Sequence, residues 1–329
     1  INMRAWKIHF IMMESSFCPY LLFEELAREL IGIDDTHPTF HKLMSGFDNM
    51  AFRIDKMLWQ LSERASELGL GDTFLALEAE KVAPKLKETE KGREWLAELD
   101  EFLKLYGRRM KQMLNIASPT WMEDPSLPIV RIQGFLRKVA TGQTFGLDEE
   151  RARLTQERKA AEQEVLAKIA PEQREWFEML LHCAQNASSW SEEHEYWIND
   201  HMDFLTHNCV LEFGRRLVQA GTFDQVDDIW YITYEDLLKI AYAPERYNMR
   251  PRVQSLRAEW EELGKALPPP AITKMSPEEA FGWMAQAKEP VLSKLVIGAL
   301  PTPKAGVQAD LWGTCGAPGT AEGLSLIHI

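Results

Sequence analysis

Ionisable side chains recur at every seventh position near the middle of the chain, within the stretch SWSEEHEYWINDHMDFLTHNCVLEFGRRLV. Steps of seven from His194 reach His201, Asn208 and Arg215. Seven residues make two turns of an α-helix with a drift of about 20°. The spacing therefore predicts one slowly winding polar stripe on a helix that spans about residues 190–220.

A second polar stripe and a row of apolar side chains run beside the first. The second stripe passes through Glu193, Asp200 and His207, and the flanking row consists of Trp190, Trp197, Phe204 and Leu211. Aromatic groups next to His, Asp and Arg can form one wall of a ligand site. We predict a substrate-binding surface from five of these residues: His194, Trp197, Asp200, His201 and Arg215. His194 is the preferred functional candidate, because aromatic neighbours could desolvate it and tune its protonation.

Two other interpretations of the same helix stay open. Asp200, Asp203 and His207 have the i, i+3, i+7 spacing and the mixed oxygen and nitrogen donors of a metal site. His194 and His201 are separated by about 10 Å of axial rise, too far to share one ion. Ionisable helix residues can also simply lie in solvent or between helices. The sequence assigns no catalytic residue, no metal and no cofactor to the chain itself.

Composition narrows the class of protein. A net charge of -13 argues against a nucleic acid partner, because phosphate binding needs clustered Lys and Arg. The four cysteines lack zinc or disulfide spacing, and no apolar run is long enough to span a bilayer. We therefore expect a cytoplasmic protein without a membrane partner. Phosphate-binding loops, nucleophile elbows and the zinc-protease motif are absent from the sequence.

The elements that must position these side chains are mostly helical. Three amphipathic segments end at Gly32, Gly69 and Gly107, residues typical of helix C-termini. Residues 229–232 favour one short strand, and Thr233 with Asp236 predicts a capping box that starts another helix. The fold class is therefore mainly α, a multi-helix domain.

Residues 148–187 predict an antiparallel helical hairpin. Its first half is mostly charged with a thin apolar stripe, and Pro171 suits the first turn of its second helix. We expect this hairpin to protrude as a solvated arm. After about residue 290, Pro, Gly and short apolar runs replace the helical pattern.

Three stretches together resemble the phosphoenolpyruvate-utilising phosphotransferases, which include phosphoenolpyruvate synthase, pyruvate phosphate dikinase, phenylphosphate synthase and rifampicin phosphotransferase. They are FLKLYGRRMKQMLNIASPTWMEDP at 102–125, NCVLEFGRRLVQAGTFDQVDDIWYITYEDLL at 208–238, and the glycine-rich GTCGAPGTAEG that begins at Gly313. The last is similar to the opening of the family's swivelling phosphohistidine domain.

The resemblance implies a domain plan. Residues 1–270 would be the helical acceptor-binding domain, 271–304 a linker, and 305–323 the truncated start of the swivelling α/β domain. The terminal residues 324–329 depart from the family pattern and are interpreted as a non-native tail. At 106–115, Met113 and Asn115 stand where antibiotic-modifying members have acidic residues, which argues against rifampicin itself.

The resemblance also implies an activity. The chain would be a piece of an ATP-dependent phosphotransferase that passes phosphate through a mobile phosphohistidine to a small-molecule acceptor. ATP and Mg²⁺ would belong to the parent protein, whose ATP-grasp and phosphohistidine domains are missing here, so the piece would be inactive alone. The alternative is a non-catalytic helical scaffold that binds a partner protein through the 148–187 arm.

Overall fold

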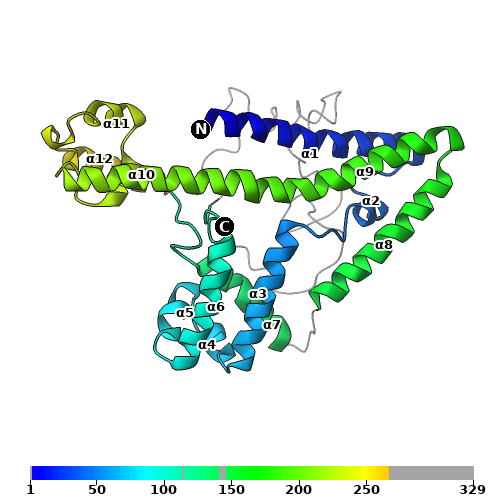
Figure 1. Ribbon diagram of the computed structural model, residues 1–329, viewed down its shortest axis with the longest axis horizontal. Coiled ribbons are helices and arrows are strands. Elements are labelled where there is room, and N and C mark those ends of the chain that lie inside the picture. The colour runs from blue at the N-terminus through cyan, green and yellow to red at the C-terminus, as the bar shows by residue number, and fades with distance from the viewer. Residues whose placement is uncertain (1, 113–114, 141–145, 267–329) are drawn as a thin grey trace. The chain divides into compact units, whose positions relative to one another are not determined.

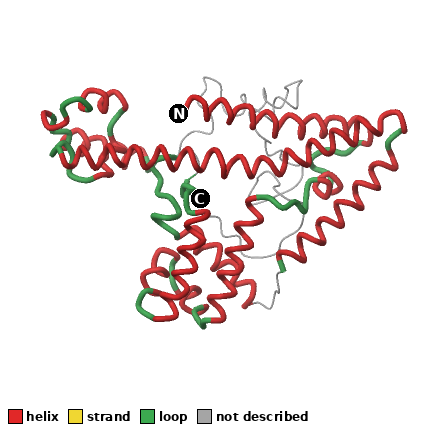
Figure 2. The backbone as a smooth tube through the Cα atoms, in the orientation of Figure 1, coloured by secondary structure: helices red, strands yellow, loops and turns green. Residues whose placement is uncertain are grey.

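The computed structural model describes residues 2–112, 115–140 and 146–266. The predicted linker at 271–304, the start of a swivelling domain at 305–323 and the tail at 324–329 lie outside these residues. Within the described ranges no β-strand occurs, and Met110 and Thr120 form an isolated antiparallel bridge (Figure 2). The prediction of a mainly α fold is confirmed.

Twelve α-helices are present in the described residues: α1 (Asn2–Ile31), α2 (Pro38–Leu43), α3 (Met50–Glu67), α4 (Gly71–Ala76), α5 (Ala79–Leu86), α6 (Glu90–Tyr106), α7 (Ser126–Ala140), α8 (Leu147–Lys168), α9 (Pro171–His194), α10 (His201–Gln219), α11 (Tyr234–Ile240) and α12 (Arg250–Leu263) (Figure 1). Three further elements are the π-helical turn η1 (Glu195–Asp200) and the 3₁₀ helices η2 (Val226–Tyr231) and η3 (Pro244–Arg246). Gly32 and Gly69, which follow α1 and α3, have φ angles of 71° and 72°, as expected for helix C-termini.

The described residues divide into two compact units. Unit 1 holds residues 2–5, 54–112, 115–140 and 195–266, and unit 2 holds residues 6–53 and 146–194. None of the described helices combines the length and the apolar run that a membrane crossing requires.

In unit 1, helices α4 to α7 pack with α3 around large buried side chains. Trp95 is fully buried, lies 4.8 Å from the Phe74 ring between centroids, and donates its indole N–H to the Leu61 carbonyl at 2.9 Å. Gly92 allows the start of α6 to approach the end of α5, since a Cβ there would lie 2.0 Å from the Leu86 carbonyl oxygen. This bundle supports the loop that joins α6 to α7.

A smaller apolar cluster in unit 1 joins α10, η2, α11 and α12. Its buried members are Leu217, Phe223, Ile229, Ile240 and Val253. The predicted strand at 229–232 is wrong, because η2 occupies most of these residues. The Asp228 carboxylate accepts the backbone N–H groups of Asp224 and Gln225 at 3.1 and 3.2 Å and so stabilises a tight turn. The predicted helix start is confirmed: Thr233 Oγ1 accepts the Asp236 N–H at 3.1 Å.

In unit 2, α8 and α9 form the predicted hairpin, but the hairpin is not a solvated arm. Its apolar stripe lies in one core with side chains of α1 and α2; the buried members are Phe23, Ala27, Ile33, Phe40, Leu43, Ala161, Val165, Ile169, Phe177, Leu180, Leu181 and Ala184. The Gln185 amide also donates to the Leu43 carbonyl at 3.1 Å and to Glu162 at 2.6 Å. The thin apolar stripe predicted from the sequence therefore packs the hairpin against α1 and α2.

Candidate functional site

The loop between α6 and α7, residues 107–124, is braced by backbone hydrogen bonds between its two arms. Trp121 N–H donates to the Arg109 carbonyl at 2.8 Å, Lys111 N–H to Pro119 at 2.8 Å, and Met122 N–H to Gly107 at 3.0 Å. This bracing lets a segment without helix or strand present several side chains in fixed directions. We call it the 107–124 loop; Met113 and Leu114 within it are not described.

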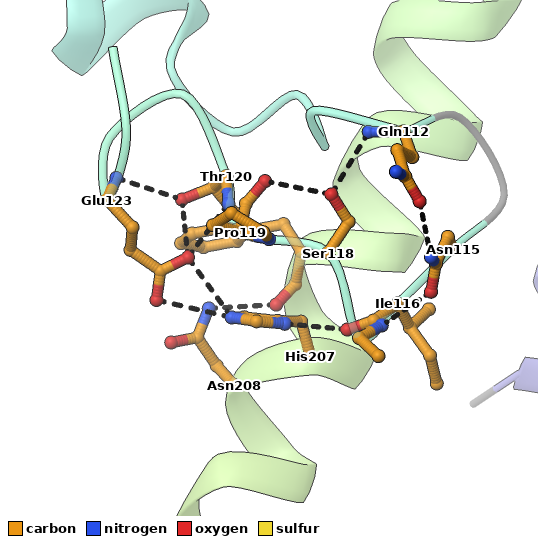
Figure 3. A network of polar contacts seen from close by, with 11 residues as sticks. Gln112, Asn115, Ile116, Ser118, Pro119, Thr120, Glu123, His207 and Asn208 are labelled. Atoms are coloured by element: carbon orange, nitrogen blue, oxygen red, sulfur yellow. Dashed lines mark hydrogen bonds and ion pairs between the residues drawn. The ribbon is translucent and has the colours of Figure 1, made fainter. Parts of the chain in front are cut away.

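His207 of α10 joins the helix to the 107–124 loop (Figure 3). Its Nδ1 lies 2.7 Å from the Ile116 carbonyl oxygen, and its Nε2 lies 3.2 Å from the Glu123 carboxylate. The ring is 3% exposed and stacks on Trp230 with centroids 5.5 Å apart. Both ring nitrogens therefore lie within hydrogen-bond distance of an oxygen of the 107–124 loop.

Glu123 is held in its charged form. Burial alone would raise the pKa of this carboxyl, but hydrogen bonds from Thr120 and His207 outweigh burial and lower the pKa below its usual value. One Glu123 oxygen accepts from the backbone N–H of Thr120 at 2.8 Å and from its hydroxyl at 2.9 Å. The Glu123 carboxylate and the ring of His207 therefore form a hydrogen-bonded pair at the base of the loop.

Two arginines at the start of the loop contact α10 near its N-terminus. Arg108 donates to His201 Nε2 at 2.7 Å, and His201 Nδ1 lies 2.8 Å from the Tyr196 carbonyl. Arginine can only donate, so Nε2 accepts and Nδ1 carries the proton of a neutral ring. Trp197 stacks on His201 with centroids 5.5 Å apart. The second arginine, Arg109, forms an ion pair with Asp200 at 3.0 Å.

Asp200 is the most perturbed carboxyl of this group. Burial raises its pKa from 3.8 to about 7; the charge of Arg109 opposes the rise, and the charges of Glu195 and Asp203 add to it. Asp200 is the last residue of η1, the π-helical turn through which the chain passes from α9 to α10. Such turns are frequent at functional sites.

A cavity of about 660 Å³ lies between the 107–124 loop, α10, η2 and α12. The described residues that line it are Gln112, Asn115, Ala117, Ser118, Pro119, Glu123, His207, Leu211, Asp227, Trp230, Tyr231 and Trp260. We call it the loop–α10 pocket. Its volume lies within the range of small-molecule sites. The pocket joins the two most informative sequence stretches, 102–125 and 208–238, which are almost a hundred residues apart.

The five residues predicted as a binding surface have different surroundings in the structure. Trp197, Asp200 and His201 lie together in unit 1. His194 lies in unit 2, where its buried ring is 2.9 Å from the Nδ1 atom of His9, and Arg215 is paired with Glu212 on the surface at 2.9 Å. Counting by sevens assumes 3.6 residues per turn, and the wider η1 turn interrupts that period between His194 and His201.

None of those five residues lines the loop–α10 pocket, whereas His207 of the second stripe does. The sequence did not indicate Glu123, Trp230 or Trp260, because their meeting depends on long-range packing. The metal alternative is also not supported: in the part of the chain that the structure describes, no three His, Cys, Asp or Glu side chains gather closely enough to hold an ion. Asp200 pairs with Arg109 and His207 with Glu123 instead.

The described residues thus form a helical body with a cavity of small-molecule size, in a sequence without a phosphate-binding loop. A family model described as the rifampicin phosphotransferase fourth domain matches residues 7–192, more than half of the chain. The chain belongs to this family. The match confirms the resemblance to the phosphoenolpyruvate-utilising phosphotransferases.

Curated relatives agree with this assignment. The chain is 22% identical over 324 residues to the uncharacterized phosphotransferase YvkC of Bacillus subtilis, an alignment that covers 97% of this chain and 36% of that protein. It is 26% identical over 146 residues to the rifampicin phosphotransferase of Bacillus cereus, covering 43% of this chain and 16% of the relative. It is also 29% identical over 247 residues to the chondramide synthase cmdD of Chondromyces crocatus, covering 74% of this chain and 6% of that protein. The chain thus spans only a minor part of each relative.

Proposed function

We propose that this chain is the acceptor-binding helical part of an ATP-dependent phosphotransferase, and that the loop–α10 pocket holds a small-molecule acceptor. The observation that carries the proposal is the convergence of the 107–124 loop and α10 on one cavity. These segments overlap the two stretches that resemble the phosphotransferase family, and they line the cavity together with η2 and α12. The related phosphotransferases support the reaction class.

The pocket supports binding rather than chemistry by its own residues. A nitrogen that accepts phosphate must be free of other contacts, and both ring nitrogens of His207 face the oxygens of Ile116 and Glu123. We therefore assign the transferable phosphate to a mobile phosphohistidine outside this chain, loaded by an ATP-grasp domain with ATP and Mg²⁺. On this proposal the 329-residue chain binds acceptor and does not turn over alone. Its four cysteines lack disulfide spacing, which supports a place in the reducing cytoplasm.

The test uses the longer protein that contains this chain, its ATP-grasp domain and its phosphohistidine domain. A panel of hydroxyl-bearing small molecules is screened for stimulation of ATP consumption, and phosphohistidine formed from ATP is measured without acceptor. Glu123→Gln removes the charge that orients His207. We expect the KM for the stimulating acceptor to rise about tenfold, the size of one lost charge-assisted contact, while phosphohistidine formation stays unchanged.

Glu101→Gln is the matched control, because Glu101 is exposed on α6 and pairs only with Lys104 among the described residues. It should leave both quantities as in the parent. The proposal is wrong if no ATP-dependent phosphohistidine forms, or if Glu123→Gln and Glu101→Gln give the same acceptor KM.

A further inference from the structure

The charges around the loop–α10 pocket are unevenly compensated. Two cationic side chains flank it, and each faces an acid: Lys111 faces Asp124 at 2.6 Å, and Arg257 faces Asp228 at 2.9 Å. The His207 ring faces Glu123 at 3.2 Å. Asp227, which lines the pocket, has no hydrogen bond or ion pair with any described residue. The pocket therefore carries one exposed carboxylate without a counter-charge.

The neighbouring aspartates 227 and 228 differ sharply in their surroundings. Asp228 is buried, accepts two backbone N–H groups and pairs with Arg257, so it holds η2 in place. Asp227 is exposed at the cavity. No Lys or Arg occurs among the described residues that line the cavity. A ligand with a negative charge would therefore find no lysine or arginine partner in the cavity wall.

Two aromatic residues of the pocket already have a partner on one face of the ring. The Arg257 guanidinium lies 4.5 Å from the centroid of the Tyr231 ring, and the His207 ring stacks on Trp230. Trp260 of α12 is 69% exposed and has no ring contact among those described. Cations are attracted to the face of an indole ring and to a carboxylate. Trp260 and Asp227 provide such a pair in one cavity.

We propose that the loop–α10 pocket takes a positively charged organic ligand, an amine or quaternary ammonium on an apolar or aromatic body. The inference rests on the proposed function, under which this charge belongs to the acceptor. The Asp227 carboxylate pairs with the ligand's nitrogen and Trp260 covers its apolar part. A drug-sized molecule fits a volume of about 660 Å³.

Three probes that differ mainly in charge test the ligand class on the 329-residue chain. They are 3-phenylpropylammonium, 3-phenylpropan-1-ol and 3-phenylpropanoate, titrated at pH 7.5 and low salt with tryptophan fluorescence and ligand-observed NMR as readouts. We expect the ammonium to bind about tenfold more tightly than the alcohol, and the carboxylate to bind more weakly than both. The preference for the ammonium should shrink as salt is added.

Two substitutions place the binding at this pocket. Asp227→Asn should bring the affinity for the ammonium close to that of the alcohol, and leave the affinity for the alcohol unchanged. Trp260→Leu should weaken ammonium binding more than alcohol binding. The matched control is Glu235→Gln, an exposed carboxylate on α11 that does not line the pocket; it should change neither affinity.

Each contrary outcome has a definite meaning. Equal or tighter binding of the alcohol or the carboxylate, absence of ammonium binding, or an unchanged preference in Asp227→Asn would overturn the cationic ligand class. If the longer protein still shows an acceptor KM that depends on Glu123, the proposed function survives that failure. If the ammonium binds as expected but no phosphohistidine forms in the longer protein, the ligand class stands and the proposed function fails.

Discussion

Asp200 is a carboxyl group that folding brings out of water without giving it a matching set of donors. Its side chain is 9% exposed, and Arg109 at 3.0 Å is the cation beside it. Burial dominates over this ion pair, so the pKa stands at about 7 instead of 3.8. Ionisation of Asp200 therefore opposes folding.

The pH dependence follows from this sign. Below about pH 4 the carboxyl is protonated in both states; between about pH 4 and pH 7 the unfolded chain releases the proton and the folded protein keeps it. The contribution of Asp200 to stability therefore falls as the pH rises through that window and is constant above it. We compare the free energy of unfolding of Asp200→Asn with that of the parent. The difference in favour of Asp200→Asn should be larger at pH 7.5 than at pH 4 by about 2–4 kcal/mol. Urea unfolding followed by circular dichroism at the two pH values measures the gain.

Asp100→Asn, at an exposed position of α6, is the control and should show no such gain. A difference between Asp200→Asn and the parent that is the same at both pH values would show that Asp200 titrates normally.

At the scale of single residues, the sequence predicted helical polar positions but not their partners, and it did not predict the η1 turn. Periodicity marked Asp200, His201 and His207 as polar positions on one helix. It did not predict the hydrogen bonds of Arg108 to His201 and of His207 to Glu123, because these partners belong to a loop about ninety residues away in the sequence. Hydrogen-bond partners of that kind are set by tertiary packing, which a helical period does not contain.

Among the elements, the contact of α10 with η2 depends on one glycine. A Cβ added to Gly214 would lie 2.5 Å from the Val226 carbonyl oxygen and 3.1 Å from Val226 Cγ1. Backbone cannot move aside as a side-chain tip can, so the helix and the 3₁₀ turn would have to separate. This glycine belongs to the GRRL stretch that the sequence singled out.

Gly214→Ala should lower the free energy of unfolding by about 1–3 kcal/mol, the usual cost of overpacking. The matched variant is Gly134→Ala in α7, where an added Cβ meets nothing within 4 Å. It should be neutral or stabilising by up to about 1 kcal/mol, because alanine favours helix. Urea midpoints of the two variants give the comparison, and equal midpoints would contradict the close contact.

The hairpin of α8 and α9 offers a second test among the elements. Phe177 is fully buried in the core that joins the hairpin to α1 and α2, and its neighbour Trp176 is 56% exposed. Phe177→Ala should cost about 3–5 kcal/mol, whereas Trp176→Ala should change stability by less than about 0.5 kcal/mol. Thermal and urea unfolding measure both. Similar small effects would instead fit the solvated arm expected from the sequence.

Helix positions and ends were predictable because they depend on local signals such as Gly32, Gly69 and Thr233. The packing of the hairpin was not, because the apolar stripe at Ala161 and Val165 is thin and only its partners in α1 and α2 make it a core. The false strand at 229–232 arose from a run of branched and aromatic residues, which the side chain of Asp228 folds into a 3₁₀ turn.

At the scale of the whole molecule, the residues that match the family model and the residues that line the pocket overlap only in part. The match covers residues 7–192. The loop–α10 pocket combines loop residues inside that range with residues from His207 to Trp260 that follow it. Ligand preference can therefore differ between members that share the matched domain, because much of the pocket wall comes from the chain beyond it.

The bracing of the 107–124 loop has a consequence for motion. Its two arms are joined through backbone amides, whereas the contacts described between the loop and α10 all involve side chains such as Arg108, Arg109 and His207. Loss of those side-chain contacts would release the loop as one cooperative piece. The amide protons of Lys111, Trp121 and Met122 should then exchange with deuterium at similar rates, and all three should speed up together when His207 is replaced.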